Sequence, residues 1–345
     1  MHKDICNDRP KEYCGLFGVA NHKNASWLTY LGLYAQQHRG EEACGIVANH
    51  NGVLTVHKNM GLVNEAFDEK NLSALRGNMA VGHVRYSTTG SSVLKNAQPL
   101  LIDFAKGTVC IAHNGNLVNS LELRQYLEQS GSIFQTTTDS ELVIHLMARA
   151  KSKNIEQSLI FALKRIRGAY SLVMMDNHQL IGIRDPMGFR PLNLGRINNS
   201  WCLASETCAF DLIGAKYIRE VEPGEIVFIS KDKIRSVKFA GEKLRNKHAF
   251  CTFEHVYFSR PDSIIFGETV HAVRRKFGEQ LAREYPIVAD LVVPVPDSGF
   301  SAALGYSKES RIPLEMGIIR NHYVGRTFIQ PAQDSREIGA RVKFN

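Results

Sequence analysis

Short apolar runs separated by turn residues fill the chain from residue 14 to about residue 240, and this pattern limits the possible folds most. Runs such as GIVANH, VLTVHK, TVCIAHNG and AYSLVMM have the length and composition of β-strands, and Gly, Asn and Asp separate many of them. Helical patterns interrupt the runs at 26–40, 139–150 and 154–167. Thr138 and Glu141 have the spacing of a capping box at the second of these. Many strands with a few helices in separate blocks indicate an α+β sandwich of layered sheets.

The pattern changes after about residue 245. A helical segment at 269–285 leads into ADLVVPVP at 289–296, an apolar run that we interpret as a buried parallel strand, and a further helix follows directly. Strand, loop and helix in this order open an α/β domain, in which ligands bind at the carboxyl ends of the strands. A chain of 345 residues is long enough for two such cores. We therefore predict domains at 14–245 and 246–345.

Composition excludes several classes of protein. No apolar run approaches the roughly 20 residues that a membrane span needs, and the charged residues 1–13 lack the apolar core of a secretory signal. The seven cysteines are scattered and contain no CxxC pair, which favours a reducing, cytoplasmic setting over a disulfide framework. A net charge of +8 allows an anionic partner, but the basic residues are dispersed and no nucleic-acid motif occurs. We expect a phosphorylated small substrate, and neither membrane nor nucleic acid.

Four segments, three of which contain glycine, carry polar residues that packing does not obviously need: QHRGEEACG, GHVRYSTTG, AHNGNL and TTTDSE. Arg85 is either a surface residue or a bidentate clamp for a carboxylate. The HNGN stretch is either a turn or an oxyanion hole made of a side-chain amide and a backbone N–H. Asp139 either begins a helix or holds an ammonium group. Cys14, in KEYCGLFGVA, is either a buried thiol or a nucleophile. Taken singly, each signal favours the structural interpretation.

Taken together and in this order behind Cys14, the segments resemble the class II glutamine amidotransferases, whose nucleophile is an N-terminal cysteine. Longer motifs narrow the resemblance to the glutamine phosphoribosylpyrophosphate amidotransferases: RDPMGFRPLNLG, ASETCAFDLIGAKYIREVEPGEIV, EHVYFSRPDS and NHYVGRTFIQPAQDSRE. The resemblance runs from about Cys14 to Asn345. It implies a four-layer αββα N-terminal-nucleophile sandwich at 14–245, followed by the first part of an α/β type I phosphoribosyltransferase domain.

The family resemblance also explains the first thirteen residues. A thiol attacks a carboxamide efficiently as the thiolate, so a nearby base must take its proton. The α-amine of an N-terminal cysteine, with a pKa near 8, lies within reach of its own sulfur. While Tyr13 is attached, that nitrogen is an amide and accepts no proton. Residues 1–13 are therefore interpreted as a removable pro-segment, and Cys14 as the nucleophile.

The family's known activity implies the other roles. Glutamine hydrolysed at the cysteine supplies ammonia to phosphoribosyl pyrophosphate, giving 5-phosphoribosylamine, glutamate and diphosphate in the first committed step of purine synthesis. By resemblance, Arg85 grips the α-carboxylate of glutamine and Asp139 its α-ammonium group. The Asn114 side chain and the Gly115 N–H hold the oxyanion. The pocket is then lined by Arg39, Gly40 and Thr88.

The donor site is expected in the second domain. Asp297 and Ser298 in VPDSG, and Arg326 and Thr327 in the basic stretch 320–337, match the family's loops around the donor. The resemblance implies Mg²⁺ with the donor, yet no adjacent acidic pair followed by a Ser/Thr/Gly-rich phosphate loop occurs in the chain. We therefore expect these 345 residues, as a fragment or a natural truncation, to support only the glutaminase half.

Two further expectations come from the resemblance. Cys251 occupies the position of the first iron–sulfur ligand in one branch of the family, although a 4Fe–4S cluster normally needs four ligands and the other three lie beyond the residues given. The family also implies a homotetramer. Two alternatives remain: a sugar-phosphate aminating amidotransferase, which should lack YVGRTFIQP and FSRPDS, and a non-catalytic truncated partner of a full-length copy.

Overall fold

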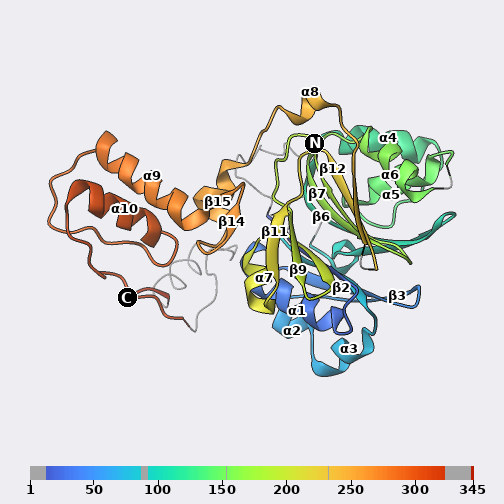
Figure 1. The fold of residues 1–345 in the computed structure, drawn as a ribbon, viewed down its shortest axis with the longest axis horizontal. Helices are drawn as coiled ribbons and strands as arrows, with labels where there is room; N and C mark the ends of the chain where they lie inside the picture. The colour runs from blue at the N-terminus through green and yellow to red at the C-terminus, as the bar shows by residue number, and fades with distance from the viewer. Residues whose placement is uncertain (1–12, 87–91, 153, 232, 323–342) are drawn as a thin grey trace, which may run out of the picture. The chain divides into compact units, whose positions relative to one another are not determined.

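The chain forms two compact units, Met1–Cys251 and Thr252–Asn345. A computed structural model describes residues 13–86, 92–152, 154–231, 233–322 and 343–345 (Figure 1). The sequence pattern predicts the change of domain at 245/246, whereas the contacts divide the chain at 251/252.

Two antiparallel sheets form the centre of the first unit. The first has the order β11-β9-β10-β1-β4-β2-β3 and the second the order β13-β12-β8-β7-β6-β5. The strands of the first sheet are β1 (Gly15–Ala20), β2 (Ala43–His50), β3 (Val53–Met60), β4 (Met79–Arg85), β9 (Asn193–Ile197), β10 (Ser200–Ala204) and β11 (Lys216–Glu220). Those of the second are β5 (Leu100–Phe104), β6 (Gly107–Leu117), β7 (Gly168–Met175), β8 (Leu180–Arg184), β12 (Glu225–Ser230) and β13 (Lys233–Lys238).

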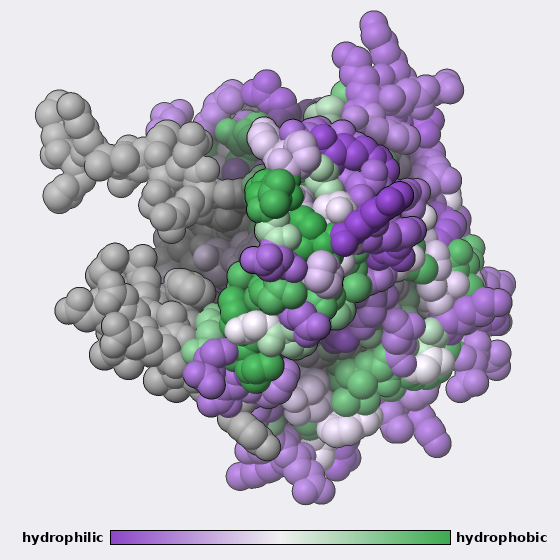
Figure 2. Space-filling view, turned by 90° about the vertical axis from the view of Figure 1, so that its left-hand side faces the viewer, coloured by the Kyte–Doolittle hydropathy of each residue, from purple (hydrophilic) through white to green (hydrophobic). Residues whose placement is uncertain are grey.

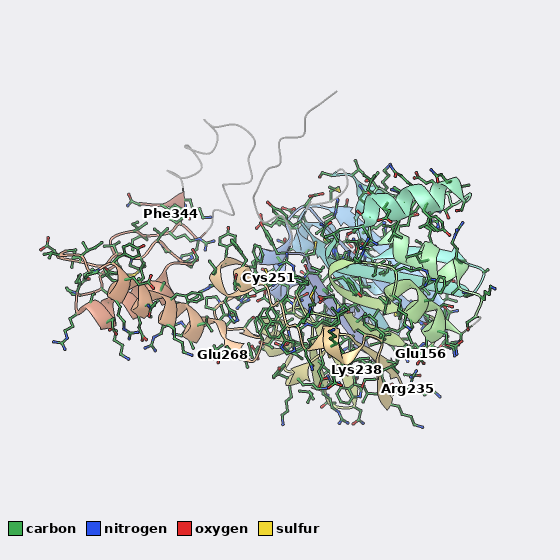
Figure 3. All side chains as sticks on the ribbon, turned by 90° about the horizontal axis from the view of Figure 1, so that it is seen from above. Glu156, Arg235, Lys238, Cys251, Glu268 and Phe344 are labelled. Carbon is green, nitrogen blue, oxygen red and sulfur yellow. The ribbon has the colours of Figure 1, made fainter. Side chains whose placement is uncertain are left out.

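Helices cover the outer face of each sheet (Figure 1). The first sheet carries α1 (Ala25–Ala35), α2 (Val63–Ala66), α3 (Glu69–Ala74) and α7 (Cys208–Ile213). The second carries α4 (Ser120–Gln129), α5 (Glu141–Arg149) and α6 (Ile155–Leu163). Shorter elements are the 3₁₀ turns η1 (Gln37–Arg39) and η2 (Leu94–Asn96) and the helix α8 (Glu242–Arg245). An ion pair of 2.7 Å joins Glu156 of α6 to Arg235 of β13 (Figure 3).

Three apolar cores separate the four layers: one under each layer of helices and one between the sheets. On β12, Ile226 and Phe228 pack toward the helices while Val227 and Ile229 pack toward the other sheet. Because strands of this kind are buried on both faces, their sequences are continuous apolar runs instead of the alternation common in antiparallel sheets. The predicted αββα sandwich is confirmed.

The start of α5 differs from the prediction. Its N-cap is Ser140, not Thr138, and Ser140 makes no capping hydrogen bond with its side chain. The Glu141 carboxylate instead accepts hydrogen bonds from the backbone N–H groups of Gln135 and Thr136, both at 2.8 Å. The preceding loop thus takes the acceptor that a capping box would use, and the predicted box is wrong.

The second unit contains two packed helices, α9 (Val270–Glu284) and α10 (Phe300–Ser310), a hairpin of β14 (Ile264–Ile265) and β15 (Glu268–Thr269), and a π-helical turn η3 (Glu254–Phe258). The strand expected at 289–296 is represented among the described residues by a single parallel bridge from Val292 to Leu314. Val293 and Val295 are exposed, so the expectation of a buried strand is wrong. Figure 2, which faces this unit, shows hydrophobic side chains gathered on its surface.

Candidate active site

Cys14 lies directly before β1, the central strand of the seven-stranded sheet, which pairs with β10 on one side and β4 on the other. The Cys14 side chain is buried. Its thiol donates a hydrogen bond to the main-chain oxygen of Tyr86, at 3.7 Å, one residue beyond β4. The sulfur therefore lies where β1 begins and β4 ends.

Tyr13, the last residue of the predicted pro-segment, packs at the same place. Its side chain is buried, and its ring stacks on that of Tyr86 with centroids 4.3 Å apart. The peptide bond between Tyr13 and Cys14 makes the cysteine nitrogen an amide, so it cannot serve as a base while this bond is intact.

The turn after α1 supports the main chain of the nucleophile. Arg39 is fully buried, and its Nε donates a hydrogen bond of 3.1 Å to the main-chain oxygen of Cys14. Gly40 follows, and a Cβ there would lie 2.5 Å from the carbonyl carbon of Arg85. Because backbone atoms cannot yield as a flexible side chain can, only glycine allows this turn to approach the end of β4 so closely.

Arg85 is the last residue of β4, and its guanidinium is buried. Its Nη1 donates to Oε1 of Glu42 at 2.8 Å, and the Glu42 N–H donates to the Arg85 main-chain oxygen at 3.2 Å. Glu42 thus orients a buried cation one residue away from the acceptor of the Cys14 thiol. A guanidinium is the side chain whose fork geometry suits a carboxylate.

Asn114 and Gly115 lie side by side on β6. Asn114 is fully buried, and neither its Oδ1 nor its Nδ2 has a hydrogen-bond partner among the described residues. Gly115 has a φ of +147°, and a Cβ there would lie 2.1 Å from the main-chain oxygen of Ala169 on β7. A buried amide without a partner costs free energy, which marks Asn114 as a group available to a ligand.

Asp139 precedes α5 and is buried. Its Oδ2 accepts a hydrogen bond of 2.9 Å from the Leu117 N–H at the end of β6, and its Oδ1 lies 3.3 Å from Nδ1 of His113. Burial opposes ionisation of Asp139, but the charge of His113 and these hydrogen bonds outweigh it and lower the pKa of the carboxyl below its ordinary value. The carboxylate is therefore ionised at neutral pH.

A hydrogen bond across the two sheets links these groups. Nε2 of His83 on β4 donates to the main-chain oxygen of His113 on β6, at 3.0 Å. Complete burial lowers the pKa of His83 to about 3, so the ring is neutral. The Gln98 side chain makes a second contact with His113. Its oxygen accepts a hydrogen bond from the His113 N–H at 2.8 Å, and its nitrogen donates to Ser140 Oγ at 3.1 Å. His113, the residue before Asn114, is thus held by His83 of β4 and by Gln98 of the segment before β5.

The structure therefore places Cys14, Arg39, Gly40 and Arg85 around the adjoining ends of β1 and β4. Asn114, Gly115 and Asp139 lie on and beside β6, which is joined to β4 by the His83 hydrogen bond. Sequence reasoning missed four residues that hold this arrangement together. Three of them lie within quoted motifs and Gln98 lies between two motifs, but only their contacts reveal their roles: Glu42, His83, Gln98 and Glu206.

Thr88, Arg326 and Thr327 fall outside the described residues. In the second unit, Asp297 is exposed and forms an ion pair with Arg320, and Ser298 is exposed beside it.

Cys251 is partly buried, and Nη1 of Arg190 donates to its sulfur at 3.4 Å (Figure 3). Within the part of the chain that the structure describes, no three His, Cys, Asp or Glu side chains gather as metal ligands. The described residues therefore do not supply the ligand set of an iron–sulfur cluster or of a resident Mg²⁺. Among the described residues, every helix is too short or too polar to span a bilayer.

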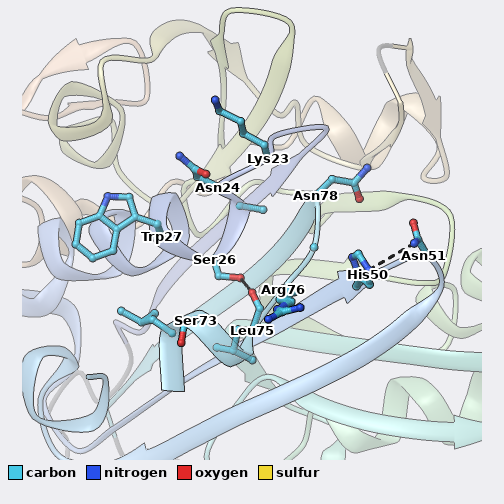
Figure 4. A pocket seen from close by; sticks show the side chains of 13 residues that line it. Lys23, Asn24, Ser26, Trp27, His50, Asn51, Ser73, Leu75, Arg76 and Asn78 are labelled. Carbon is cyan, nitrogen blue, oxygen red and sulfur yellow. Dashed lines mark hydrogen bonds between the residues drawn. The ribbon is translucent and has the colours of Figure 1, made fainter. Parts of the chain in front are cut away.

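A cavity of about 570 Å³ lies beyond the end of β1 that is opposite to Cys14. Figure 4 shows the side chains that line it. It is lined by residues of the 23–27 segment that follows β1, by His50 at the end of β2, by Asn51 directly after it, and by most of residues 72–78. None of the predicted glutamine-site residues lines it, so we assign it no part in the chemistry.

Comparison with known proteins fits this geometry. A model of the glutamine amidotransferase domain matches residues 83–211. The chain is 48% identical over 346 residues to amidophosphoribosyltransferase 1, chloroplastic, of Arabidopsis thaliana, covering 100% of this chain and 61% of that protein. It is 46% identical over 335 residues to amidophosphoribosyltransferase of Bacillus subtilis, covering 97% and 70%.

A solved structure agrees with these matches. Glutamine phosphoribosylpyrophosphate amidotransferase from B. subtilis, complexed with ADP and GMP, superposes with a TM-score of 0.88 at 45% identity, covering 96% of this chain and 72% of that one. The αββα sandwich with its cysteine before the central strand defines a class II glutamine amidotransferase. The chain belongs to the amidophosphoribosyltransferase family. It spans 61% of the length of the Arabidopsis relative.

Proposed function

We propose that the first unit hydrolyses the side-chain amide of glutamine at Cys14. The Sγ thiolate attacks the amide carbon, the tetrahedral intermediate expels ammonia, and a thioester remains. Water then cleaves the thioester, which releases glutamate and restores the thiol. The α-amine of Cys14, once freed from Tyr13, takes the thiol proton and delivers it to the leaving nitrogen.

The observation that carries this proposal is the buried, unpartnered amide of Asn114. An amide that neither sheet satisfies is available to donate to an oxyanion, with the Gly115 N–H beside it on the same strand. Arg85, oriented by Glu42, binds the α-carboxylate of glutamine, and the ionised Asp139 binds its α-ammonium group. Arg39 donates a hydrogen bond to the Cys14 carbonyl, and Gly40 lets the turn pack closely against the end of β4.

For the whole protein, we propose the reaction named by its relatives: transfer of the ammonia to phosphoribosyl pyrophosphate, giving 5-phosphoribosylamine and diphosphate. The second unit would bind phosphoribosyl pyrophosphate. The candidates for contacts with it are Asp297 and Ser298, together with Arg326 and Thr327, which fall outside the described residues. The 45–48% identity to amidophosphoribosyltransferases supports this assignment over a sugar-phosphate aminating enzyme. We further propose a cytoplasmic, homo-oligomeric enzyme that takes Mg²⁺ with its donor.

Glutamate release from glutamine by protein that begins at Cys14 tests the core of the proposal. We expect steady turnover. When the reaction is quenched in acid, mass spectrometry of the peptides should detect a thioester adduct at Cys14. Turnover without any adduct at Cys14 would show that the nucleophile is elsewhere.

A further inference from the structure

We infer that Glu206 is a positioning residue for the nucleophile: through Arg39, its buried carboxylate holds the main chain of Cys14 at the start of β1. The inference rests on the proposed function and adds to it a residue that does not touch substrate. Glu206 lies two residues beyond β10, the strand that pairs with β1.

Two hydrogen bonds of Arg39 connect Glu206 to Cys14. Glu206 is fully buried, and its Oε1 accepts from Nη1 of Arg39 at 2.5 Å and lies 2.7 Å from Nε2 of His38. The guanidinium of Arg39 uses its Nε for the Cys14 carbonyl, at 3.1 Å. Two directional contacts on one planar guanidinium fix its orientation, so moving the carboxylate moves the donor to Cys14.

A second set of hydrogen bonds ties the same segments to β1. The Glu206 N–H donates to Oε1 of Gln36 at 3.2 Å, and Nε2 of Gln36 donates to the main-chain oxygen of Leu16 at 3.0 Å. The Leu16 N–H donates to Oγ of Ser205, also at 3.0 Å. The segments that carry Glu206 and Arg39 are thus both registered against the residues that follow the nucleophile.

Stability alone does not account for an ionic pair here. Each buried charge loses its hydration, and replacing such a pair with apolar side chains of similar size is often neutral or stabilising. The pair of Arg39 and Glu206 does, however, provide a rigid donor to Cys14, which an apolar pair cannot. A nucleophile displaced by about 1 Å can lose about 100-fold in rate.

The test compares Glu206→Gln with a double variant, Arg39→Met with Glu206→Met, and with Glu220→Gln as the matched control. Glu220, on β11, accepts a hydrogen bond of 2.9 Å from Nη1 of the buried Arg184, on β8. Each variant is assayed for kcat and KM of glutaminase, for the rate at which iodoacetamide alkylates Cys14, resolved peptide by peptide, and for its melting temperature.

We expect Glu206→Gln to lower kcat by about 10-fold to 100-fold with KM changed by less than about 3-fold, and to change the alkylation rate of Cys14. The double variant should melt no lower than the unsubstituted protein yet keep the low kcat. Glu220→Gln should change neither kcat nor alkylation.

Wild-type kcat in the double variant would mean that the pair serves only folding, and would overturn the inference. An equal loss of Cys14 reactivity in Glu220→Gln would do so too. If the unsubstituted protein shows no glutaminase activity, the proposed function fails, but the alkylation rates of Glu206→Gln and unsubstituted protein still decide whether Glu206 positions Cys14.

Discussion

The rings of Tyr13 and Tyr86 stack with centroids 4.3 Å apart, which places the end of the proposed leader against the strand end that accepts the Cys14 thiol. Cleavage between Tyr13 and Cys14 would therefore do two things at one point. It would free the α-amine that the thiol needs as a base, and it would remove the ring that packs on Tyr86.

The active species is accordingly expected to begin at Cys14. Protein with the leader intact should release glutamate at a small fraction of the rate of processed protein, because its cysteine nitrogen is an amide. N-terminal sequencing of each preparation, alongside a glutamate assay, makes the comparison. Full activity in protein that begins at Met1 would contradict the N-terminal nucleophile mechanism.

Cys14→Ala should abolish glutamine hydrolysis in processed protein. Cys202→Ala is the matched control, because Cys202 is also a buried cysteine on the first sheet and burial raises the pKa of its thiol to about 12, which leaves it inert. The control should keep its kcat. Loss of activity in both variants would point to a general effect of disturbing the sheet.

Arg85→Lys tests how the substrate carboxylate is bound. Lysine keeps the charge but loses the bidentate fork and the contact with Glu42. We therefore expect kcat/KM to fall, mainly through KM, by an amount equivalent to roughly 1.5–3 kcal/mol of transition-state binding. Arg235→Lys, which alters an exposed ion pair with Glu156, should leave kcat/KM unchanged. Equal losses of kcat/KM in the two variants would show that Arg85 does not bind the substrate.

Asn114→Ala should separate function from stability. Its amide makes no hydrogen bond to the described residues, so we expect kcat to fall by about 10²–10³ with little change in KM and with folding free energy nearly unchanged. Asn49 is the counterpart: it is equally buried, but it donates to the Asp176 main-chain oxygen and accepts from the Gly52 N–H. Asn49→Ala should cost about 1–3 kcal/mol of stability and spare kcat. Urea unfolding and steady-state kinetics of both variants measure these effects. A large loss of stability with unchanged kcat in Asn114→Ala would contradict its proposed role.

How far the sequence predicts the fold is clearest on β12. EIVFIS is identifiable as a strand from its β-branched and aromatic residues, and its lack of alternation follows from burial on both faces. The segment 289–296 is also rich in valine, but it contains Pro294 and Pro296, which have no N–H to donate, and it is not a strand here. Composition reports the preference of a segment, whereas a strand also needs a neighbour to pair with, and that lies outside the local sequence.

The site shows the same division. Motif order is enough to single out Cys14, Asn114 and Arg85. It could not show that Arg39 donates to the Cys14 carbonyl, nor that Glu206, 167 positions further along the chain, supports that arginine. Contacts of this kind depend on how β1 and β10 are paired, which no spacing in the sequence encodes.

Acid should weaken the segment that leads to Asp139, and Glu141 is the group responsible. Burial opposes its ionisation, but hydrogen bonds from His145, Gln135 and Thr136 outweigh it and lower the pKa of Glu141 from 4.5 to about 2. A carboxyl with a lowered folded-state pKa stabilises the fold fully above its unfolded pKa, near 4.5. That stabilisation disappears as the pH falls toward 2. Discounted for solvent screening, it is worth about 2 kcal/mol at neutral pH.

Glu141→Gln should therefore lower the free energy of unfolding at pH 7 by about that amount and flatten its decline between pH 5 and pH 2. Urea unfolding across this range measures both effects. Glu122→Gln, at an exposed position on α4, should reproduce the unsubstituted curve. Because residues 135–141 carry Asp139 to the end of β6, Glu141→Gln should also raise KM for glutamine more than it lowers kcat. A variant with an unchanged pH profile of stability would show that the Glu141 hydrogen bonds contribute nothing to folding.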